Sequence, residues 1–403
     1  MTTVKYQIDR RGSRVTCPPS RYLETAAHAL KRAAESAASE GLRPTAIGIT
    51  SQAQTFVKVN QYGETLGPAI VWLDSAADIQ AEETSIALPD FADTSGFSSP
   101  SPLQFLPKVM RVRRTGIRRY LLLNEWLIHQ LTGHSYGDTN SQGMGGFWDV
   151  SIGDWNQRAL NLAGIHQDNL AVVRPAGTHA TSLLPRWQEE FGLNPIPVYS
   201  CGNDQSCAAI GAGLEEAGDL FCNFGTALVV YGLTSLYCKP SGENQIAGVA
   251  PLPNLWFLLG VESEFGSVID RLAKKISPRG GVGPMITEAL SPDIDSTSLP
   301  DVQIRDGDLD GVLLKQNPNR YVRAILEMYS SRFGELLGEV TAKLGKPKRI
   351  FVGGGLSQSR PWLDLLERRH GIRLIPTDTE HPGLRGVARV IAKAHRSDSG
   401  TQV

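Results

Sequence analysis

One stretch of the chain places a carboxylate where a ligand would lie. The apolar run Val198–Cys201 predicts a buried strand, and Gly202 and Asp204 follow it directly. Small residues then continue to Gly213, which predicts a closely packed helix that ends at this glycine. Ligands of open α/β sheets bind in the crevice at the strand ends. Asp204 is therefore a candidate functional residue, although an aspartate at a helix start also serves as a capping residue.

Two further turns offer backbone groups to a ligand. Gly225 and Thr226 lead into the predicted strand Ala227–Gly232, and such a turn can present N–H groups and a hydroxyl to a phosphate. The turn Gly353–Gly355 follows the predicted strand Arg349–Val352 directly. Three glycines after a strand let a flat ligand or a phosphate approach the backbone. Each turn taken alone also fits an ordinary change of chain direction.

Polar side chains collect at the ends of predicted strands nearer the N-terminus. These strands cover Thr45–Thr50, Thr55–Val59 and Ala69–Trp72. Gln52 and Gln54 lie between the first two strands, and Asp74 follows the third. Amides and a carboxylate grouped in this way suit a polyhydroxylated ligand, whose hydroxyls need both donors and acceptors.

The elements that position these residues alternate between strands and helices. Helical periodicity predicts helices over Ser20–Gly41, with Ser20 as cap, over Leu121–Leu131 and over Asn319–Leu344. Lys108–Arg119 carries six basic residues and no acid, which predicts a solvated surface helix. It lacks the interleaved aromatic residues of a nucleic-acid site. Ser277–Gly311 is rich in Pro, Gly, Asp and Ser and predicts a long loop.

Length and composition narrow the class of protein. The 403 residues predict two domains, and 40 basic against 41 acidic residues favour neither nucleic acid nor a membrane surface as partner. The five cysteines lack metal-ligand spacing and predict reduced, buried thiols in a cytoplasmic protein. The first residues lack a signal peptide's apolar core, and no apolar run is long enough to span a bilayer.

The order of the motifs resembles that of FGGY carbohydrate kinases, the actin-like sugar kinases that include xylulokinase, glycerol kinase and gluconokinase. The resemblance runs from about Tyr6 to Ala394. It rests on Ile47–Val57, Ala69–Asp74, Leu131–Gly133, Phe147–Asp149 with Trp155, Gly202–Gly213, Gly225–Thr226, Gly353–Gly355 and Gly386–Ala388.

The resemblance implies an α/β protein with two actin-like (ribonuclease H-like) domains and a cleft between them. A sugar-binding domain would cover residues 1–215 and a nucleotide-binding domain residues 216–395, with a disordered tail at 396–403. The chain would transfer a phosphoryl group from ATP, with Mg²⁺, to a hydroxyl of a sugar or polyol. It would be cytoplasmic, with no nucleic-acid or membrane partner, and the resemblance allows a homodimer. Pentuloses, hexuloses, polyols and aldonates remain open as substrates.

The resemblance also implies roles for single residues. Asp204 would accept the proton of the attacking hydroxyl. Gln52, Gln54, Asp74 and Gln205 would contact the substrate. Phosphates would lie at Gly225 and Thr226, and the adenosine at Gly353, Gly354 and Gly355.

One departure from the family pattern concerns the first phosphate turn. The family opens with a strand and the turn Gly-Ile-Asp-X-Gly-Thr, whose aspartate helps to hold the metal. The nearest stretch here, Ile8–Ser13, has one residue too many and arginines where the backbone must approach phosphate. We therefore expect the first domain to lack its opening strands and identify no metal ligand. An inactive or impaired kinase, or a fragment, that binds sugar or nucleotide is the alternative, and an interaction protein that uses Lys108–Arg119 is a third.

Overall fold

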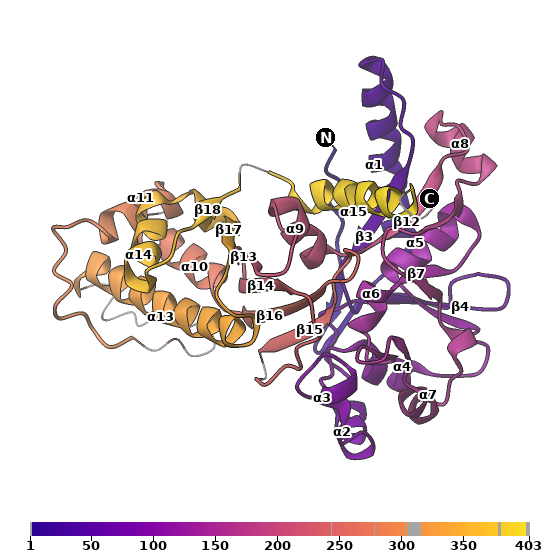
Figure 1. The fold of residues 1–403 in the computed structure, drawn as a ribbon, viewed down its shortest axis with the longest axis horizontal. Helices are drawn as coiled ribbons and strands as arrows, with labels where there is room; N and C mark the ends of the chain where they lie inside the picture. The colour runs from indigo at the N-terminus through magenta and orange to yellow at the C-terminus, as the bar shows by residue number, and fades with distance from the viewer. Residues whose placement is uncertain are drawn as a thin grey trace.

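The computed structural model describes residues 2–242, 244–277, 279–302, 304, 316–377 and 380–399, the last five of them by backbone alone. Figure 1 shows two lobes side by side, with the N-terminal half of the chain in one and most of the C-terminal half in the other. The last helix, α15, lies across the middle and reaches back over the first lobe. None of the helices in the described ranges is both long and apolar enough to cross a membrane.

The first lobe contains an antiparallel sheet of five strands. In spatial order these are β1 (Asp9–Arg11), β2 (Arg14–Cys17), β5 (Ala69–Ile70), β4 (Phe56–Val59) and β6 (Arg119–Leu122). Helix α1 (Pro19–Ser39) follows β2, and its Tyr22 joins the apolar core that β2, β4 and β6 share. This sheet positions the segments that carry Gln52, Gln54 and Asp74.

A second sheet of the first lobe leads to Asp204. Its central strand is β12 (Pro197–Asn203), which runs parallel to β3 (Ile47–Ser51) and antiparallel to β11 (His179–Ser182). Among the described residues β3 pairs with β12 alone. Residues Val198 to Asn203 are all buried, as the continuous apolar pattern predicts for a central strand. The strand therefore delivers Asp204 from the interior to the end of the sheet.

The second lobe is built on a six-stranded sheet. Its spatial order is β15 (Gln245–Val249), β16 (Trp256–Glu262), β14 (Leu228–Thr234), β13 (Asp219–Phe224), β17 (Arg349–Gly353) and β18 (Ile375–Pro376). The helices that supply its main apolar core are α10 (Gly266–Ile276), α11 (Val282–Ala289), α13 (Pro318–Leu344) and α14 (Arg360–His370). Strands β13 and β17 run parallel, so the turns that follow them lie at the same edge of the sheet.

Two helices cross where the lobes meet. α9 (Asp204–Ala212) packs against α15 (Pro382–Ser399), and α15 also contacts β3 and β12. A Cβ atom at Gly211 would lie 1.7 Å from the Pro382 carbonyl oxygen, and one at Gly386 would lie 1.8 Å from that of Cys207. Only glycine fits at either position, because backbone cannot yield as a flexible side chain does.

The remaining elements complete the two lobes. They are α2 (Asp78–Ala87), α3 (Phe91–Thr94), α4 (Phe105–Val112), α5 (Leu123–Thr132), β7 (Tyr136–Asp138), α6 (Thr139–Gly143), β8 (Trp148–Asp149), β9 (Asp154–Trp155), α7 (Gln157–Ala163), η1 (Gln167–Asn169), β10 (Val172–Arg174), α8 (Pro185–Phe191) and η2 (Gly355–Gln358). All five cysteines are free thiols, and all but Cys238 are buried.

The solvated basic helix predicted over Lys108–Arg119 is wrong in its bounds and in the burial of its first part. Helix α4 starts at Phe105 and ends at Val112, and every residue from Phe105 to Met110 is buried. The Lys108 ammonium donates to the carbonyl oxygens of Val71 and Trp72, each at 3.0 Å. Arg111 pairs with Asp74. Charge misled the prediction for Lys108 and Arg111, because partners elsewhere in the chain satisfy these two groups inside the lobe.

Four other predicted features differ from the structure. The predicted helix Leu121–Leu131 begins with the last residues of strand β6, and its helical part starts only at Leu123. The loop predicted over Ser277–Gly311 contains helix α11, whose apolar face enters the core, while residues 278, 303 and 305–311 lie outside the described ranges. Ser20 is not the cap of α1, because the helix begins at Pro19. Helix α15 continues to Ser399, into the predicted tail, and residues 400–403 lie outside the described ranges.

Candidate functional site

Asp204 is the first residue of α9, directly after the buried strand β12. The helix cap is Asn203, whose side-chain oxygen accepts a hydrogen bond from the Ser206 N–H at 3.0 Å. The Asp204 carboxylate accepts one from the N–H of its neighbour Gln205 at 2.9 Å. Because Asn203 fills the capping role, the second oxygen of Asp204 remains available to a ligand.

A buried amide fixes the backbone beneath Asp204. The Asn140 side-chain oxygen accepts from both the backbone N–H and the amide of Asn203, each at 2.8 Å. The Asn140 amide donates to the Ser206 hydroxyl at 3.1 Å and to the Val249 carbonyl oxygen at 2.7 Å. Tyr231 of β14 donates to the same hydroxyl at 3.0 Å. This network joins α6, α9 and two strands of the second lobe around the start of α9.

A buried carboxylate holds the C-terminal end of strand β12 in place. Asp138 accepts hydrogen bonds from the Ser200 hydroxyl and from the Gly202 N–H, the latter at 3.1 Å. Burial raises the pKa of Asp138, and these hydrogen bonds oppose the rise. Gly202 has φ of 90°, and a Cβ there would lie 2.7 Å from the Asn140 side-chain oxygen. Glycine is therefore required two residues before Asp204, where the strand turns toward the helix.

The surroundings of Asp204 tune its acidity. Its side chain is exposed, while protein surrounds it on the other sides. These surrounding residues desolvate the carboxylate and raise the pKa of Asp204 to about 6. The hydrogen bond from the Gln205 N–H acts in the opposite direction and lowers it. A carboxylate with a pKa near neutrality can take a proton from a hydroxyl and release it again.

The glycine turn of the second lobe lines a pocket of about 310 Å³. Asn223 of β13 lies directly opposite Gly353 of β17 in the parallel ladder. The pocket is lined by Ala208, Phe221, Asn223, Gly353, Gly354, Gly355, Ser357, Gln358, Thr377, Glu380 and Pro382. Ala208 belongs to α9, so the helix that begins with Asp204 also forms a wall of this pocket.

The three glycines of that turn are glycines for different reasons. Gly354 has φ of 85°, and a Cβ there would lie 2.6 Å from the carbonyl carbon of Phe224. A Cβ at Gly353 would lie 2.9 Å from the Phe221 ring. At Gly355 a Cβ would meet nothing within 4 Å, and its backbone is not in the left-handed region. Packing therefore explains Gly353 and Gly354, whereas Gly355 leaves open space beside the pocket.

A helix start lies against the Gly225–Thr226 turn. The N–H of Gly266, the first residue of α10, donates to the Thr226 carbonyl oxygen at 2.8 Å, and a Cβ at Gly266 would lie 2.2 Å from the Gly225 oxygen. The Thr226 side chain is exposed. The N-terminus of an 11-residue helix next to an exposed Gly-Thr turn favours an anion there. Sequence reasoning missed Gly266, because its partner lies 40 residues earlier.

Two glutamines of the predicted sugar side are engaged with the protein itself. Gln52 donates to the Tyr22 hydroxyl at 3.2 Å and to the Thr55 hydroxyl at 3.0 Å. Gln54 has φ of 63°, a left-handed conformation. Its amide donates to the Met144 carbonyl oxygen, and its oxygen accepts from the Phe105 N–H at 2.7 Å. Gln54 thus joins three segments, while the side-chain oxygen of Gln52 keeps its capacity to accept.

Asp74 is fully buried and paired. One oxygen accepts from Arg111 at 2.7 Å, and the other accepts from the Val15 N–H at 2.9 Å. A substrate hydroxyl would have to replace one of these bonds. Gln205, by contrast, lies next to Asp204 with an exposed side chain. The structure therefore brings Asp204 and Gln205 together at the surface and places Asp74 in the interior.

Two tyrosines extend this side of the site. The rings of Tyr6 and Tyr22 meet edge to face with centroids 5.0 Å apart, and Tyr22 also accepts from Gln52. Burial and Cys17 raise the pKa of the Tyr6 hydroxyl, and the charge of Asp204 contributes as well. The segment around Tyr6 therefore lies near Asp204. Only the apolar spacing of Tyr22 in the first helix hinted at this from sequence.

The described residues contain no group of three His, Cys, Asp or Glu side chains that could hold a metal. Mg²⁺ at phosphate-transfer sites is bound by one or two carboxylates together with substrate phosphates and waters. The exposed carboxylate of Asp204 would suit one such contact to a metal that arrives with a nucleotide.

Comparisons with known proteins identify proteins that are similar to this chain. Residues 4–211 match the N-terminal domain of the FGGY family of carbohydrate kinases. The chain is 23% identical over 348 residues to the xylulose kinase of Escherichia coli (strain K12), which covers 82% of this chain and 71% of that protein. It resembles the crystal structure of xylulose kinase from Rhodospirillum rubrum, with a TM-score of 0.84 at 20% identity over 96% of this chain and 83% of that one. Plasmodium falciparum glycerol kinase with ADP gives a TM-score of 0.83 at 16% identity over 98% of this chain and 84% of that one. The predicted two-domain actin-like α/β fold is confirmed.

Proposed function

The chain belongs to the FGGY family of carbohydrate kinases, and on that premise we propose that it transfers the γ-phosphoryl group of ATP to a sugar or polyol hydroxyl with Asp204 as general base. The observation that supports this proposal most strongly is the combined position, exposure and pKa of Asp204. It starts a helix that Asn203 already caps, it is exposed, and its pKa is raised to about 6. A carboxylate with only a structural role would have no need of this combination.

The proposed step moves one phosphoryl group and one proton. The substrate hydroxyl oxygen forms a bond to the γ-phosphorus, the bond from that phosphorus to the β-phosphate oxygen breaks, and the hydroxyl proton passes to Asp204. The products are a sugar phosphate and ADP. Phosphoryl transfer demands mainly positioning and neutralisation of charge. The main contribution of this lobe to the reaction is therefore that the Asn140 hydrogen bonds hold the backbone beside Asp204 in place.

On the nucleotide side we place the adenosine in the pocket of about 310 Å³ beside Gly353, Gly354 and Gly355. The phosphates would extend toward Gly225 and Thr226, where the start of α10 adds a favourable helix dipole. Mg²⁺ bound with the nucleotide would neutralise phosphate charge, and Asp204 is the carboxylate of this site that could contact it. The nucleotide-binding domain would then begin near residue 216, with α15 returning to the first lobe.

On the sugar side we assign direct contacts to Gln205 and to the oxygen of Gln52. Gln54 and Asp74 take part in substrate binding by holding the loops in place, because their polar groups already bond Phe105, Met144, Arg111 and Val15. Tyr22 positions the amide of Gln52. The family's substrates, in the names of the relatives above, are consistent with a ligand rich in hydroxyl groups.

The test is turnover by the purified chain. The protein is incubated with MgATP and a panel of pentuloses, hexuloses, polyols and aldonates, and both ADP release and sugar phosphate are measured. We expect ADP release that depends on at least one panel member and an equal amount of its phosphate. Binding of MgATP and a sugar without any sugar phosphate would contradict the proposal.

A second candidate function is binding of sugar or nucleotide without turnover. It is favoured by the stretch Ile8–Ser13, which contains strand β1 and the exposed turn Gly12–Ser13 that leads to β2. Arg10 and Arg11 are exposed there, and Asp9 lies 3.9 Å from Arg21. This geometry differs from a turn that closes on phosphate through backbone N–H groups. Calorimetric binding with no turnover in the assay above would select this candidate.

A further inference from the structure

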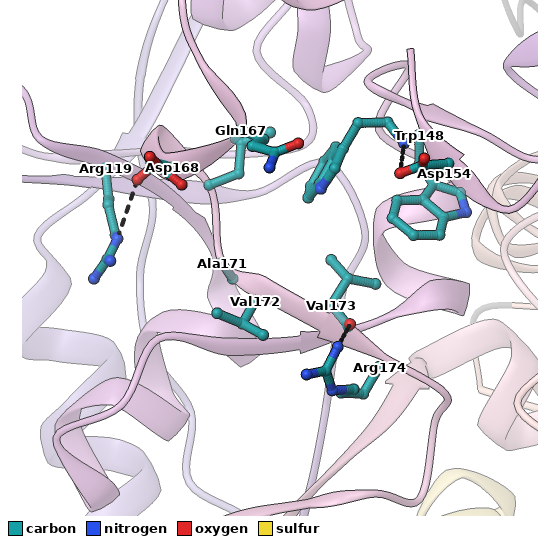
Figure 2. A pocket seen from close by; sticks show the side chains of 11 residues that line it. Arg119, Trp148, Asp154, Gln167, Asp168, Ala171, Val172, Val173 and Arg174 are labelled. Carbon is teal, nitrogen blue, oxygen red and sulfur yellow. Dashed lines mark hydrogen bonds between the residues drawn. The ribbon is translucent and has the colours of Figure 1, made fainter. Parts of the chain in front are cut away.

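A pocket of about 350 Å³ lies in the first lobe and shares no residue with the candidate site (Figure 2). It is open to solvent and is bounded by the β8–β9 hairpin, by η1 and by strand β10. Its lining residues are Arg119, Trp148, Asp154, Trp155, Gln167, Asp168, Leu170, Ala171, Val172, Val173 and Arg174. This volume falls within the range of small-ligand sites.

An aromatic corner forms one wall of the pocket. Trp148 and Trp155 face each other across the β8–β9 hairpin, with ring centroids 5.2 Å apart and planes at 80°. Trp148 is buried and supports the pair, whereas Trp155 is partly exposed. An indole ring offers a wide apolar face, and the C–H face of a sugar ring is apolar in the same way.

Polar groups of both signs surround this corner. Figure 2 shows Arg119 and Asp168 on one side of the pocket, Gln167 between, and Asp154 and Arg174 toward the other side. Within the described chain, these two arginines and two aspartates form no ion pair with one another. The side-chain amide of Gln167 has no hydrogen-bond partner there, and Asp154 uses one oxygen on the Trp155 N–H at 2.7 Å.

The two arginines can also donate hydrogen bonds to a ligand. Among the described residues Arg119 makes two long hydrogen bonds, at 3.4 Å to the Asp168 carbonyl oxygen and at 3.3 Å to Ser135. Arg174 reaches the Val173 carbonyl oxygen at 3.4 Å and also interacts with the Tyr136 side chain. Bonds of this length are weak, and a ligand oxygen at a shorter distance could replace them.

We propose that this pocket is a second, non-catalytic binding site for a neutral sugar or polyol. Two arginines and two aspartates leave the lining with no net charge, which disfavours an anion or a cation relative to a neutral ligand. A ligand with many hydroxyls uses the amide and guanidinium donors together with the carboxylate acceptors. The apolar part of the lining accepts the ring or carbon chain of the same molecule.

The walls of the pocket are preformed. The hairpin is fastened by the hydrogen bond from the Asn156 N–H to the Phe147 carbonyl oxygen at 2.8 Å. Strand β10 pairs in parallel with β7, and Asn169 at the end of η1 donates to the Arg118 carbonyl oxygen at 2.9 Å. Binding would therefore not require these segments to become ordered first, which favours affinity.

The experiment is hydrogen–deuterium exchange of the full chain with D-xylose, D-glucose and xylitol, each titrated in the absence of nucleotide. We expect at least one of them to slow exchange in residues 148–155 and 167–174. Gln167→Ala should weaken this protection about fivefold, as the loss of one hydrogen bond implies. Trp155→Ala should weaken it more than about tenfold. The matched controls are Gln61→Ala and Trp187→Ala, which lie outside both sites and should leave the protection unchanged.

Several results would overturn the proposal. One is that none of the three compounds slows exchange in these two segments. Another is that Gln167→Ala leaves the protection intact, and this variant decides the question if Trp155→Ala does not fold. Protection by sodium sulfate as strong as that by the sugars would show an anion site instead. Protection confined to residues near Asp204 would show that the chain has one sugar site, and would leave the proposed kinase activity untouched.

Discussion

The two sides of the candidate site are held in place by different kinds of contact. On the sugar side, buried polar groups from distant segments bond one another and fix Asp204 through Asn203, Asn140 and Asp138. On the nucleotide side, the turns sit at the ends of two parallel strands over an apolar core, and glycines allow the close backbone approach. Side chains therefore define the first region, and backbone defines the second.

This difference determines how each side responds to substitution. A buried polar network is stable only when every member is satisfied, so removal of one member affects the fold before it affects a ligand. A glycine turn beside open space can be altered with little effect on the fold. Substitutions on the sugar side should then combine losses of stability and of activity, and those at Gly355 should separate them.

The largest stability effect is expected for Asp74→Ala. It leaves the half-buried Arg111 without its partner, and loss of one member of a buried pair costs about 3–5 kcal/mol of the free energy of unfolding. Urea denaturation measures this, with the exposed Asp93→Ala, which breaks a surface pair with Lys239, as a control near zero. Unchanged stability together with a raised KM for sugar would instead make Asp74 a substrate contact.

The next largest effect tests whether the glycine turn binds the nucleotide. Gly354→Ala forces a left-handed residue against the Phe224 backbone, and we expect ATP affinity to fall about 30-fold with a loss of stability of about 2 kcal/mol. Gly355→Ala meets no protein atom, so stability should not change, while ATP affinity should fall about tenfold if adenosine lies there. Calorimetry gives both affinities. Equal ATP binding by the Gly355 variant and the parent would remove this turn from the nucleotide site.

A smaller effect tests whether the cap of α9 positions Asp204. Asn203→Ala removes the cap of α9, which costs about 1 kcal/mol, and it frees the backbone next to the carboxylate. We expect kcat to fall about tenfold while the KM for ATP stays constant. Asn203→Ser restores a capping oxygen and should recover much of the loss. If the alanine variant keeps the parental kcat, the cap is not needed to position Asp204.

A separate effect, on stability alone, concerns pH and the buried carboxyl of Glu125. Burial raises its pKa to about 8 in the folded state, from about 4.5 when exposed. Between these values the folded chain binds the extra proton, so stability is highest at low pH and declines as pH rises from about 4.5 to 8. Glu125→Gln should flatten this slope by at most about 1.4 kcal/mol per pH unit.

Asp138 also has a raised pKa and keeps part of the slope in that variant. Urea denaturation at a series of pH values provides the comparison. A slope that is the same in the Glu125→Gln variant and in the parent would mean that Glu125 is ionised in the folded chain throughout this range.

The sequence predicted the backbone features of the site better than the roles of its polar side chains. Strand β12, the helix after Asp204 and the glycine turn after β17 follow from local pattern, because apolar runs and glycines act on their immediate neighbours. The cap of α9 could not be chosen from sequence. Asn203 and Asp204 are adjacent and are equally good capping residues, and only the structure shows which one bonds Ser206.

The polar networks could not be predicted, because their partners are far apart in sequence. Asn140 and Asn203 are separated by 63 residues, and Asp138 and Gly202 by 64. The same reason explains the error over Lys108–Arg119, whose partners Asp74, Val71 and Trp72 lie in an earlier segment. The return of α15 to the first lobe likewise depends on Gly211 and Gly386, which meet only in the folded chain.

The most direct test of the central claim compares Asp204→Asn with Asp78→Asn. Both aspartates are exposed and each is the first residue of a helix, but Asp78 lies on α2, outside the site. Sugar phosphate formed from MgATP is measured for both variants and for the parent. The account predicts that Asp204→Asn lowers kcat at least ~10²-fold, the contribution of a general base, and that Asp78→Asn keeps the parental value. Near-parental turnover by purified Asp204→Asn, with contaminating kinase excluded, would contradict it.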